Sequence, residues 1–278
     1  MANESTYAGI SGLVANIFEL AIMTAQEGNI MAPLVTTWTA DNSAPRVWGE
    51  YSGGTFATVT EATDMAAQTF NAATAGTATP ATYGSQVFLT DRRIRADAAN
   101  AQSEAGKYLG ETASAHIDTN LAGLFSSLTG GTVGTAGGTI TWANILRAQA
   151  YLRTNKVFGR YAVVVHPVQW YYLTSPTSGV PTLMQSDEIK NSVIGGFYMA
   201  SFSNMDFFAD ANISSGTAAV AGMFGRPAIY LDVRKPFTIE PQRDASRGAG
   251  GWELNASMEY AYGVYRPTFG VQMIGTSS

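Results

Sequence analysis

The longest stretch of this chain that can form a single helix runs from Asp91 to Leu128. It contains no proline, and its apolar or small residues recur at steps of three and four, which places them on one face of an α-helix. Asp91 can cap the start, and the Thr-Gly-Gly sequence after Leu128 can end the helix, because glycine tolerates positive φ. Such a helix would be roughly 55 Å long, whereas a globular helix typically has about 11–12 residues. The stretch therefore predicts an elongated molecule with a helical spine.

The composition favours a protein with large contact surfaces. The 278 residues are 46% hydrophobic but only 13% charged, and about 25% charged residues is usual for a globular protein. Many of the other residues are alanine, threonine, serine and glycine. This fits a subunit whose surface is covered by neighbours, and equally a secreted, repetitive surface protein. The net charge of −5 argues against a protein that binds nucleic acid.

The sequence shows no signal for export or for membrane insertion. No basic residue precedes Arg46, whereas a secretory signal needs a positive region before its apolar run. The best apolar run, Ile10–Met23, is interrupted by Asn16 and Glu19 and is too short to span a bilayer. The chain contains no cysteine, so it has no disulfide and no thiolate metal site. We expect assembly in a reducing cytoplasm, without a membrane anchor.

The N-terminal third predicts an arm and a long hairpin. Residues 1–9 form a polar arm, and Ser11–Glu27 an amphipathic helix that either joins the core or packs on a neighbouring subunit. Asn71–Thr82 is nearly all alanine, threonine and glycine, and buries too little apolar surface to fold alone. We expect it to be the mobile tip of the hairpin, or a disordered surface loop. Strands are expected at Val35–Trp38, Arg46–Trp48, Thr55–Thr60 and Gln86–Thr90.

The remainder predicts an α/β region followed by a strand-rich end. A second helix is expected over Thr141–Asn155 with Thr141 as its cap, then a buried strand over Tyr161–His166, and Pro167 opens the next helix. Together with the spine, this pattern indicates an α+β protein. Further elements are expected as a helix-like stretch at Leu183–Asn191 and strands at Gly196–Phe202, Asp206–Ala209, Ala228–Val233, Phe237–Glu240, Glu253–Gly263 and Gly270–Ile274.

No pattern predicts catalysis, a cofactor or a metal. The two histidines, His116 and His166, lie on different predicted elements without ligand spacing for a metal. The glycine-rich segment Thr129–Thr139 contains neither a phosphate-binding loop nor a dinucleotide fingerprint, and no Gly-x-Ser-x-Gly occurs. Asp187 and Glu188 are adjacent, so they do not face one another on a helix. An enzyme in which the long helix is a core element is therefore disfavoured.

The charged residues near the start of the long helix indicate a contact surface. Arg92, Arg93 and Arg95 form the densest basic cluster, where cations oppose the helix dipole at a cost of roughly a few tenths of a kcal/mol each. This placement fits acidic partners, or a solvated helix start. The candidates for contacts between subunits are Arg92, Arg93, Arg95, Glu50, Glu61 and Asp64.

Several local patterns follow one another in a fixed order along residues 30–275. They are Tyr83-Gly84-x-x-Val87-x-Leu89-Thr90-Asp91, Val163-Val164-Val165-His166-Pro167-x-x-Trp170-x-x-Leu173, Ile194-Gly195-Gly196-Phe197 with Ser203-Asn204, Phe224-Gly225-x-x-Ala228-Ile229, Ile239-Glu240, Gly263, and Arg266-Pro267-x-x-Gly270-Val271. Their order resembles the major capsid proteins of tailed double-stranded DNA phages, which have the HK97 fold. In that family a hairpin strand enters a spine helix, a strand-to-helix step opens an axial domain, and a glycine turn and closing strands follow.

The resemblance implies an α+β, HK97-like capsid fold. Its parts would be an N-terminal arm (1–44), an extended hairpin loop (45–90), a peripheral domain with the spine helix (91–161 and 226–278) and an axial domain (162–225). It also implies a structural protein without enzyme activity. Such a subunit self-assembles through pentamers and hexamers into an icosahedral shell around double-stranded DNA, which it does not bind sequence-specifically. The place of assembly would be the cytoplasm of a bacterial host, and the destination the virion capsid.

Two departures from the family pattern shape the expected partners. No long helical scaffold segment precedes the arm, so we expect a separate scaffold protein or none, beside portal and decoration proteins. No lysine occurs before Lys107, so we expect no cross-link through a lysine of the hairpin. Two other interpretations stay open: an encapsulin-like nanocompartment shell of the same fold, and a secreted surface or adhesin-type protein.

Overall fold

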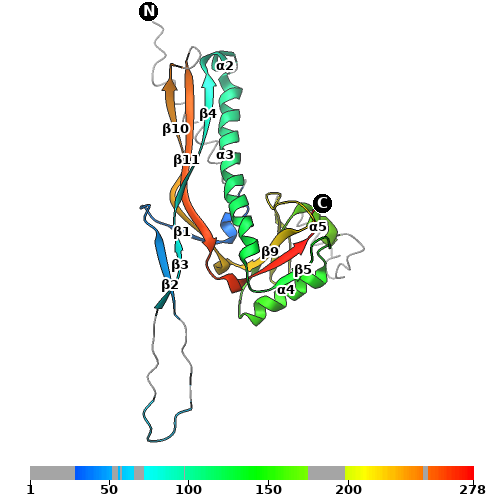
Figure 1. Ribbon diagram of the computed structural model, residues 1–278. Coiled ribbons are helices and arrows are strands. Elements are labelled where there is room, and N and C mark those ends of the chain that lie inside the picture. Colours follow the sequence, from blue (N-terminus) through cyan, green and yellow to red (C-terminus); the bar gives the residue numbers. More distant parts are fainter. Residues whose placement is uncertain are drawn as a thin grey trace, which may run out of the picture.

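The computed structural model describes residues 29–51, 56, 58–65, 72–96, 98–174, 198–246 and 250–278. The predicted helices at 11–27 and 183–191 lie outside these residues. The described part is α+β and elongated: a long helix runs beside three long strands, a narrow hairpin projects at one end, and an α/β region lies beside the other end of the helix (Figure 1). No helix among the described residues is long and apolar enough to cross a membrane.

A four-stranded sheet lies along the spine in the order β1-β10-β11-β4. Its longest strand is β10, in which the two strands expected at 228–233 and 237–240 are joined. The register with β11 shifts between Val233 and Thr238, so the chain bends there and continues. β1 pairs parallel to β10, and the other pairs are antiparallel. The strands are β1 (Thr36–Thr39), β4 (Ala81–Thr90), β10 (Ile229–Asp244) and β11 (Gly251–Val264).

A six-stranded sheet in the order β5-β12-β9-β6-β8-β7 forms the second region. The helices α4 (Trp142–Thr154) and α5 (Pro167–Thr174) contribute to its core. The predicted cap is confirmed, because the Thr141 side chain accepts from the Asn144 N–H. The strands are β5 (Thr132–Gly134), β6 (Tyr161–Val165), β7 (Tyr198–Phe202), β8 (Met205–Ala209), β9 (Ala219–Gly225) and β12 (Gly270–Gly275), and the short 3-10 helices of the chain include η1 (Ala32–Leu34), η2 (Leu124–Ser127), η5 (Arg226–Ala228) and η6 (Pro267–Phe269).

The predicted spine helix is present but is not one straight rod. It is divided into α2 (Asp91–Ala96) and α3 (Ala98–Gly123), and η2 continues it to Ser127. Arg93 and Glu104 form an ion pair of 3.6 Å. In one continuous helix, residues eleven positions apart would be separated by about 16 Å along the axis. The chain therefore turns between α2 and α3, and the prediction of an unbroken helix is wrong there.

The hairpin pairs β2 (Arg46–Tyr51) with β3 (Ala72–Ala78) in antiparallel register. The prediction that the alanine- and threonine-rich segment at 71–82 is the hairpin tip is wrong, because its residues from Ala72 onward lie in β3 and the start of β4, apart from the two-residue link between them. Small side chains do not prevent strand formation where backbone partners are available, and here β2 and β11 supply them. A strand was also expected over 55–60, but residues 56 and 58–60 have no strand conformation.

Candidate subunit interface

Four aromatic rings pack together where the hairpin leaves the body. Trp48 of β2 lies 5.0 Å from Tyr230 of β10 and 5.7 Å from Tyr265, centroid to centroid. Trp38 of β1 stacks on Tyr230 at 5.0 Å. Ala78 of β3 is buried in the same cluster. Tilted and offset ring pairs of this kind stabilise beyond simple burial, by about 0.5–1.5 kcal/mol each. The base of the hairpin is therefore packed against the sheet.

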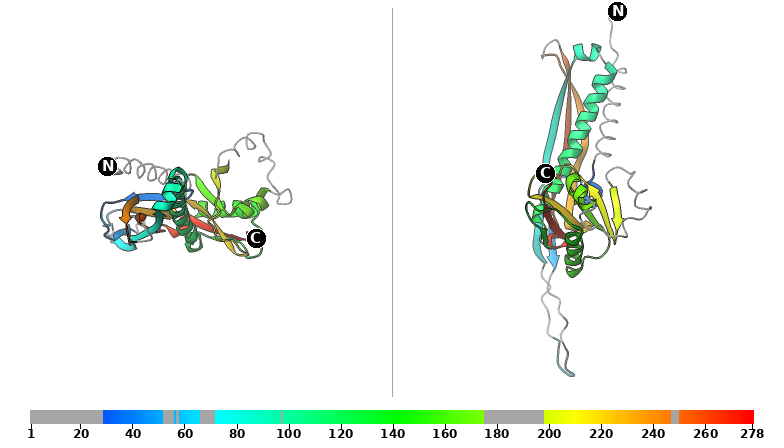
Figure 2. Two further views of the ribbon diagram at one scale, coloured as in Figure 1. Left: turned by 90° about the horizontal axis from the view of Figure 1, so that it is seen from above. Right: turned by 90° about the vertical axis from the view of Figure 1, so that its right-hand side faces the viewer.

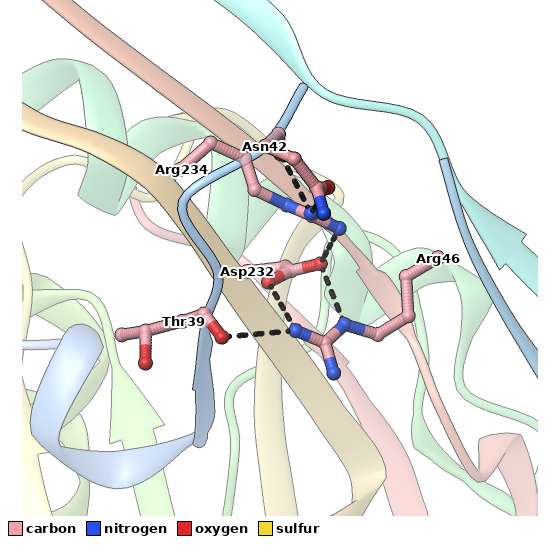
Figure 3. Close-up of polar contacts among 5 residues, drawn as sticks. All are labelled: Thr39, Asn42, Arg46, Asp232 and Arg234. Atoms are coloured by element: carbon pink, nitrogen blue, oxygen red, sulfur yellow. Dashed lines mark hydrogen bonds and ion pairs between the residues drawn. The ribbon is translucent and has the colours of Figure 1, made fainter. Parts of the chain in front are cut away.

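Figure 3 shows a network of ion pairs, in which the Arg46 guanidinium lies 5.3 Å from the centre of the Trp38 ring of this aromatic cluster. Arg46 of β2 donates through Nε and Nη2 to the two carboxylate oxygens of Asp232, at 3.0 and 3.3 Å. Arg234 donates through Nη2 to Asp232 Oδ2 at 2.6 Å. Arg46 also donates to the Thr39 carbonyl at 3.1 Å, and Arg234 donates to the backbone and side-chain oxygens of Asn42, both at 2.8 Å. We call Arg46, Asp232 and Arg234 the root triad.

The root triad is a buried contact with a defined orientation. Asp232 is completely buried and Arg234 almost so, whereas about a third of the Arg46 side chain is exposed. A buried carboxylate without partners would be strongly unfavourable, so Asp232 requires both guanidinium groups. The bidentate contact with Arg46 fixes an angle as well as a distance. Since Arg46 belongs to the hairpin and Asp232 to the sheet, the triad fixes the direction in which the hairpin leaves the body.

The far end of the hairpin presents apolar side chains to water. Phe56 is fully exposed, and Val59 and Met65 have relative exposures of 56% and 78%. Glu61 and Asp64 are exposed in the same segment. Apolar groups gathered on a projecting segment indicate a surface that a partner covers.

The candidate contact residues predicted from sequence lie at two ends of the molecule. α2 lies at one end and the hairpin at the other, as the side view shows (Figure 2). The structure therefore does not bring the basic and acidic sets together within one chain. Arg93 pairs with Glu104, and the neighbouring Asp91 accepts from Arg243 at 2.6 Å. Arg92, Arg93 and Arg95 are exposed in α2, Glu61 and Asp64 are exposed near the hairpin tip, and for Glu50 only the backbone in β2 is described.

A second buried carboxylate fixes the start of the described chain to the spine. Asp118 of α3 accepts from the backbone N–H groups of Ile30 and Met31, at 2.9 and 3.0 Å. Burial raises the pKa of Asp118 to about 6, while the two backbone hydrogen bonds oppose the rise and the nearby Asp210 adds to it. The pKa of Asp210 is also raised by burial. Asp118 thus holds Ile30 and Met31 against α3.

The two histidines occupy separate surroundings. His116 lies against the rings of Tyr83 and Tyr260, and Asn120 contacts its Nε2 at 3.2 Å. Burial lowers the pKa of His166. In the described parts of the chain, no group of three His, Asp or Glu side chains could hold a metal ion. Asp187 and Glu188 lie outside those parts.

Sequence reasoning missed the residues that organise the hairpin root and the arm. Asp232 and Arg234 follow the apolar run Ile229–Leu231, and Asp118 lies on the buried face of α3. Aspartate is almost never fully buried unless it has partners. A charged residue inside an apolar run was therefore the available signal, although the partner of each residue is distant in sequence.

Comparison with known proteins agrees with this architecture. Residues 73–273 match a sequence family described as phage capsid protein. The head structure of Helicobacter pylori bacteriophage KHP40 aligns with a TM-score of 0.68 and 10% identity, over 88% of each chain. A structure of Mycobacterium phage Che8 gives 0.67 and 16% identity, over 84% of this chain and 85% of that chain.

A virus-like particle from Pyrococcus furiosus gives a TM-score of 0.61 and 11% identity, over 94% of this chain and 98% of that chain. No curated protein sequence matches the chain. At these identities the structural likeness establishes the fold alone, and the sequence match establishes the family. The chain belongs to the phage capsid protein family, and it is a capsid shell protein with an HK97-like fold.

Proposed function

We propose that this capsid protein forms an icosahedral shell of pentamers and hexamers that encloses double-stranded DNA. The observation that carries this proposal is the hairpin, which projects beyond the body with Phe56, Val59 and Met65 in water (Figure 1). A projection on one side that fits a surface elsewhere on the next copy makes a heterologous contact, and such contacts close into rings. One contact repeated at slightly different angles can serve rings of five and of six.

The charges support a contact between opposite ends of two copies. No lysine or arginine occurs between Arg46 and Arg92, whereas that segment carries Glu50, Glu61 and Asp64. In the proposed contact, the acidic hairpin of one subunit meets the arginines of α2 in the next. Each exposed ion pair contributes only about 0–1 kcal/mol. Weak contacts repeated over many copies let wrongly placed subunits dissociate before the shell closes.

We propose a domain division that follows the two sheets. The arm (1–44) and the hairpin (45–90) keep their expected bounds. The peripheral domain contains the spine with β10 and β11, which β1 of the arm and β4 of the hairpin segment join in the four-stranded sheet, and the axial domain contains the six-stranded sheet. Because Val133, Trp142 and Met273 belong to the core of the six-stranded sheet, we assign β5, α4 and β12 to the axial domain rather than to the peripheral segments 91–161 and 226–278.

The remaining expectations concern partners and location. We propose assembly in the cytoplasm of a bacterial host, where scaffold, portal and decoration proteins are the expected partners. The net charge of −5 fits a container that tolerates DNA without binding it tightly. We assign the shell no enzyme activity and no cofactor, and no cross-link through a hairpin lysine.

Electron microscopy and sedimentation of the purified, overexpressed protein test the proposal. The expected result is closed shells with fivefold and sixfold rings, which take up double-stranded DNA in the presence of the packaging machinery. Subunits that stay monomeric at all concentrations contradict a shell. Particles purified from native cells that contain a cargo protein in place of DNA would favour a nanocompartment, whose fold is the same.

A further inference from the structure

The hairpin needs support from outside its own two strands. In the described part of the chain β2 and β3 form a two-stranded sheet with no third strand. An isolated two-stranded ribbon is at best marginally stable in water. Its direction must therefore be set where it joins the body, and that junction is the root triad with the aromatic cluster beside it.

The root triad holds both sides of the junction. Arg46 is the first residue of the hairpin strand β2, and Asp232 lies in the central strand β10. Arg234 reaches in the other direction and holds Asn42, which lies in the segment between β1 and the hairpin. The buried Asp232 carboxylate therefore holds the hairpin to the sheet directly, through Arg46. It holds the segment before the hairpin indirectly, through Arg234. A planar guanidinium in a two-pronged contact resists rotation, which a single hydrogen bond does not.

The pairing of the two hairpin strands is interrupted just beyond this junction. Trp48 faces Gly76 and Gly49 faces Thr74, which leaves Ala75 as an extra residue in β3. At Gly76 a Cβ atom would lie 2.3 Å from Trp48 Cζ2, so only glycine admits the ring of the aromatic cluster. A bulge bends a strand pair and weakens its ladder locally. The segment held against the body thus ends at Trp48, where the bulge interrupts the strand pairing.

We propose that Arg46, Asp232 and Arg234 are positioning residues for shell assembly, and that the bulge at Ala75, opposite Trp48 and Gly49, is the elbow of the hairpin. The triad holds the root at one angle in every subunit. The part beyond the elbow adjusts to the different surroundings of pentamers and hexamers. This inference rests on the proposed shell function, because the root angle decides which part of a neighbouring subunit the tip reaches.

Distance measurements on dissociated subunits test the two parts separately. The chain has no cysteine, so pairs of spin labels can be attached without background. One label is placed on α3 with Thr112→Cys, and the other on the root with Val47→Cys or on the tip with Val59→Cys, all at exposed positions. We expect a narrow distance distribution for the root pair and a broad one for the tip pair. A root distribution as broad as that of the tip overturns the proposal.

Variants then connect the root angle to assembly. Arg46→Gln removes the two-pronged contact, and Arg46→Lys keeps the charge without it. The matched control is Glu240→Gln, which removes an exposed carboxylate from the same strand as Asp232. We expect the root distribution to widen at least about twofold in Arg46→Gln and less in Arg46→Lys, because the guanidinium fork is lost. The shells of Arg46→Gln should vary in diameter, and those of Glu240→Gln should not.

The outcomes separate this inference from the shell function itself. A root distribution that stays narrow in Arg46→Gln overturns the positioning role, whether or not shells form. Uniform shells made from subunits with a widened root overturn the link between root angle and assembly. Wild-type subunits with a narrow root that form no shell refute the proposed function, while the structural part of the inference stands. Circular dichroism and thermal unfolding show that each variant is folded, so that a widened root is not a sign of global unfolding.

Discussion

The hairpin root and the α2 end each contain an aspartate held by arginine, but in opposite surroundings. At the root, Asp232 is completely buried between two guanidinium groups. At the other end, Asp91 and Arg243 form a two-pronged pair whose side chains are 21% and 43% exposed. Each aspartate accepts a two-pronged contact from one arginine. Burial decides how much each ion pair contributes to stability, because water screens the exposed pair and competes for its hydrogen bonds.

The largest effect is expected at the root. Asp232→Asn leaves two arginines facing an amide in a buried place, and breaking one side of a buried ion pair typically costs about 3–5 kcal/mol. We expect the free energy of unfolding, measured with urea on dissociated subunits, to fall by that amount. Glu240→Gln on the same strand should change it by less than about 0.5 kcal/mol. Equal effects of the two variants would contradict the contrast between buried and exposed carboxylates.

The second effect concerns Asp118, a buried carboxylate that accepts hydrogen bonds from two backbone N–H groups. Burial raises the pKa of Asp118 to about 6, so the folded state binds a proton between about pH 4 and pH 6 that the unfolded state has released. The contribution of Asp118 to stability should therefore be largest below about pH 4 and fall by roughly 3 kcal/mol as the pH rises through 6.

Substitution isolates this contribution from its neighbours. The pKa of Asp210 is also raised and that of His166 is lowered, both by burial, so the comparison must be between the pH slopes of two proteins. Asp118→Asn should reduce the fall in stability between pH 4 and pH 6. Asp64→Asn, at an exposed carboxylate of the hairpin, should leave the slope unchanged. Urea unfolding at each pH gives both slopes, and identical slopes for wild type and Asp118→Asn would contradict the assignment.

The hairpin tip should affect assembly without affecting the subunit. Phe56 is fully exposed in the single chain, so Phe56→Ser should leave the free energy of unfolding unchanged. If a neighbouring subunit covers the ring, the variant loses about 2 kcal/mol per contact. The subunit concentration needed for shells, measured by sedimentation, should then rise about tenfold or more. A matched variant that removes the exposed ring of Tyr171 in α5 tests whether loss of an exposed aromatic ring elsewhere also raises the subunit concentration needed for shells.

The sequence allowed most of the elements to be predicted, but few of the contacts that orient them. The spine, the Thr141 cap and most strands of the two sheets follow from local periodicity and capping residues, but β5 in the glycine-rich segment and β9 were not among the expected strands. The turn between α2 and α3 does not, because residues 91–128 contain no proline to mark it and the Arg93–Glu104 pair depends on the folded chain. The assignment of 71–82 to a loop failed because composition ignores backbone partners, and β2 and β11 supply them.

The root triad could not be predicted for a related reason. Arg46 and Asp232 are 186 positions apart, and neither residue belongs to a local motif. The charge of the hairpin, in contrast, was visible in the sequence, since a count of charged residues needs no knowledge of contacts. Local patterns thus led to a prediction of contact residues on the hairpin, while the residues that orient the hairpin became apparent only in the folded chain.

The smallest effect is expected at the exposed pair of the α2 end. The Arg243 hydrogen bonds lower the pKa of Asp91, so its contribution is present at neutral pH and is lost as the pH falls through the lowered value. Asp91→Asn should reduce the free energy of unfolding by less than about 1 kcal/mol at low salt. In 1 M salt, where the screening length is about 3 Å, the difference should shrink further. The effect of Asp232→Asn should persist in the same salt, because the Asp232 carboxylate is completely buried and is not reached by water or ions. If salt removed both effects equally, the root triad would be as solvated as the Asp91–Arg243 pair, and it could not hold the hairpin at a fixed angle.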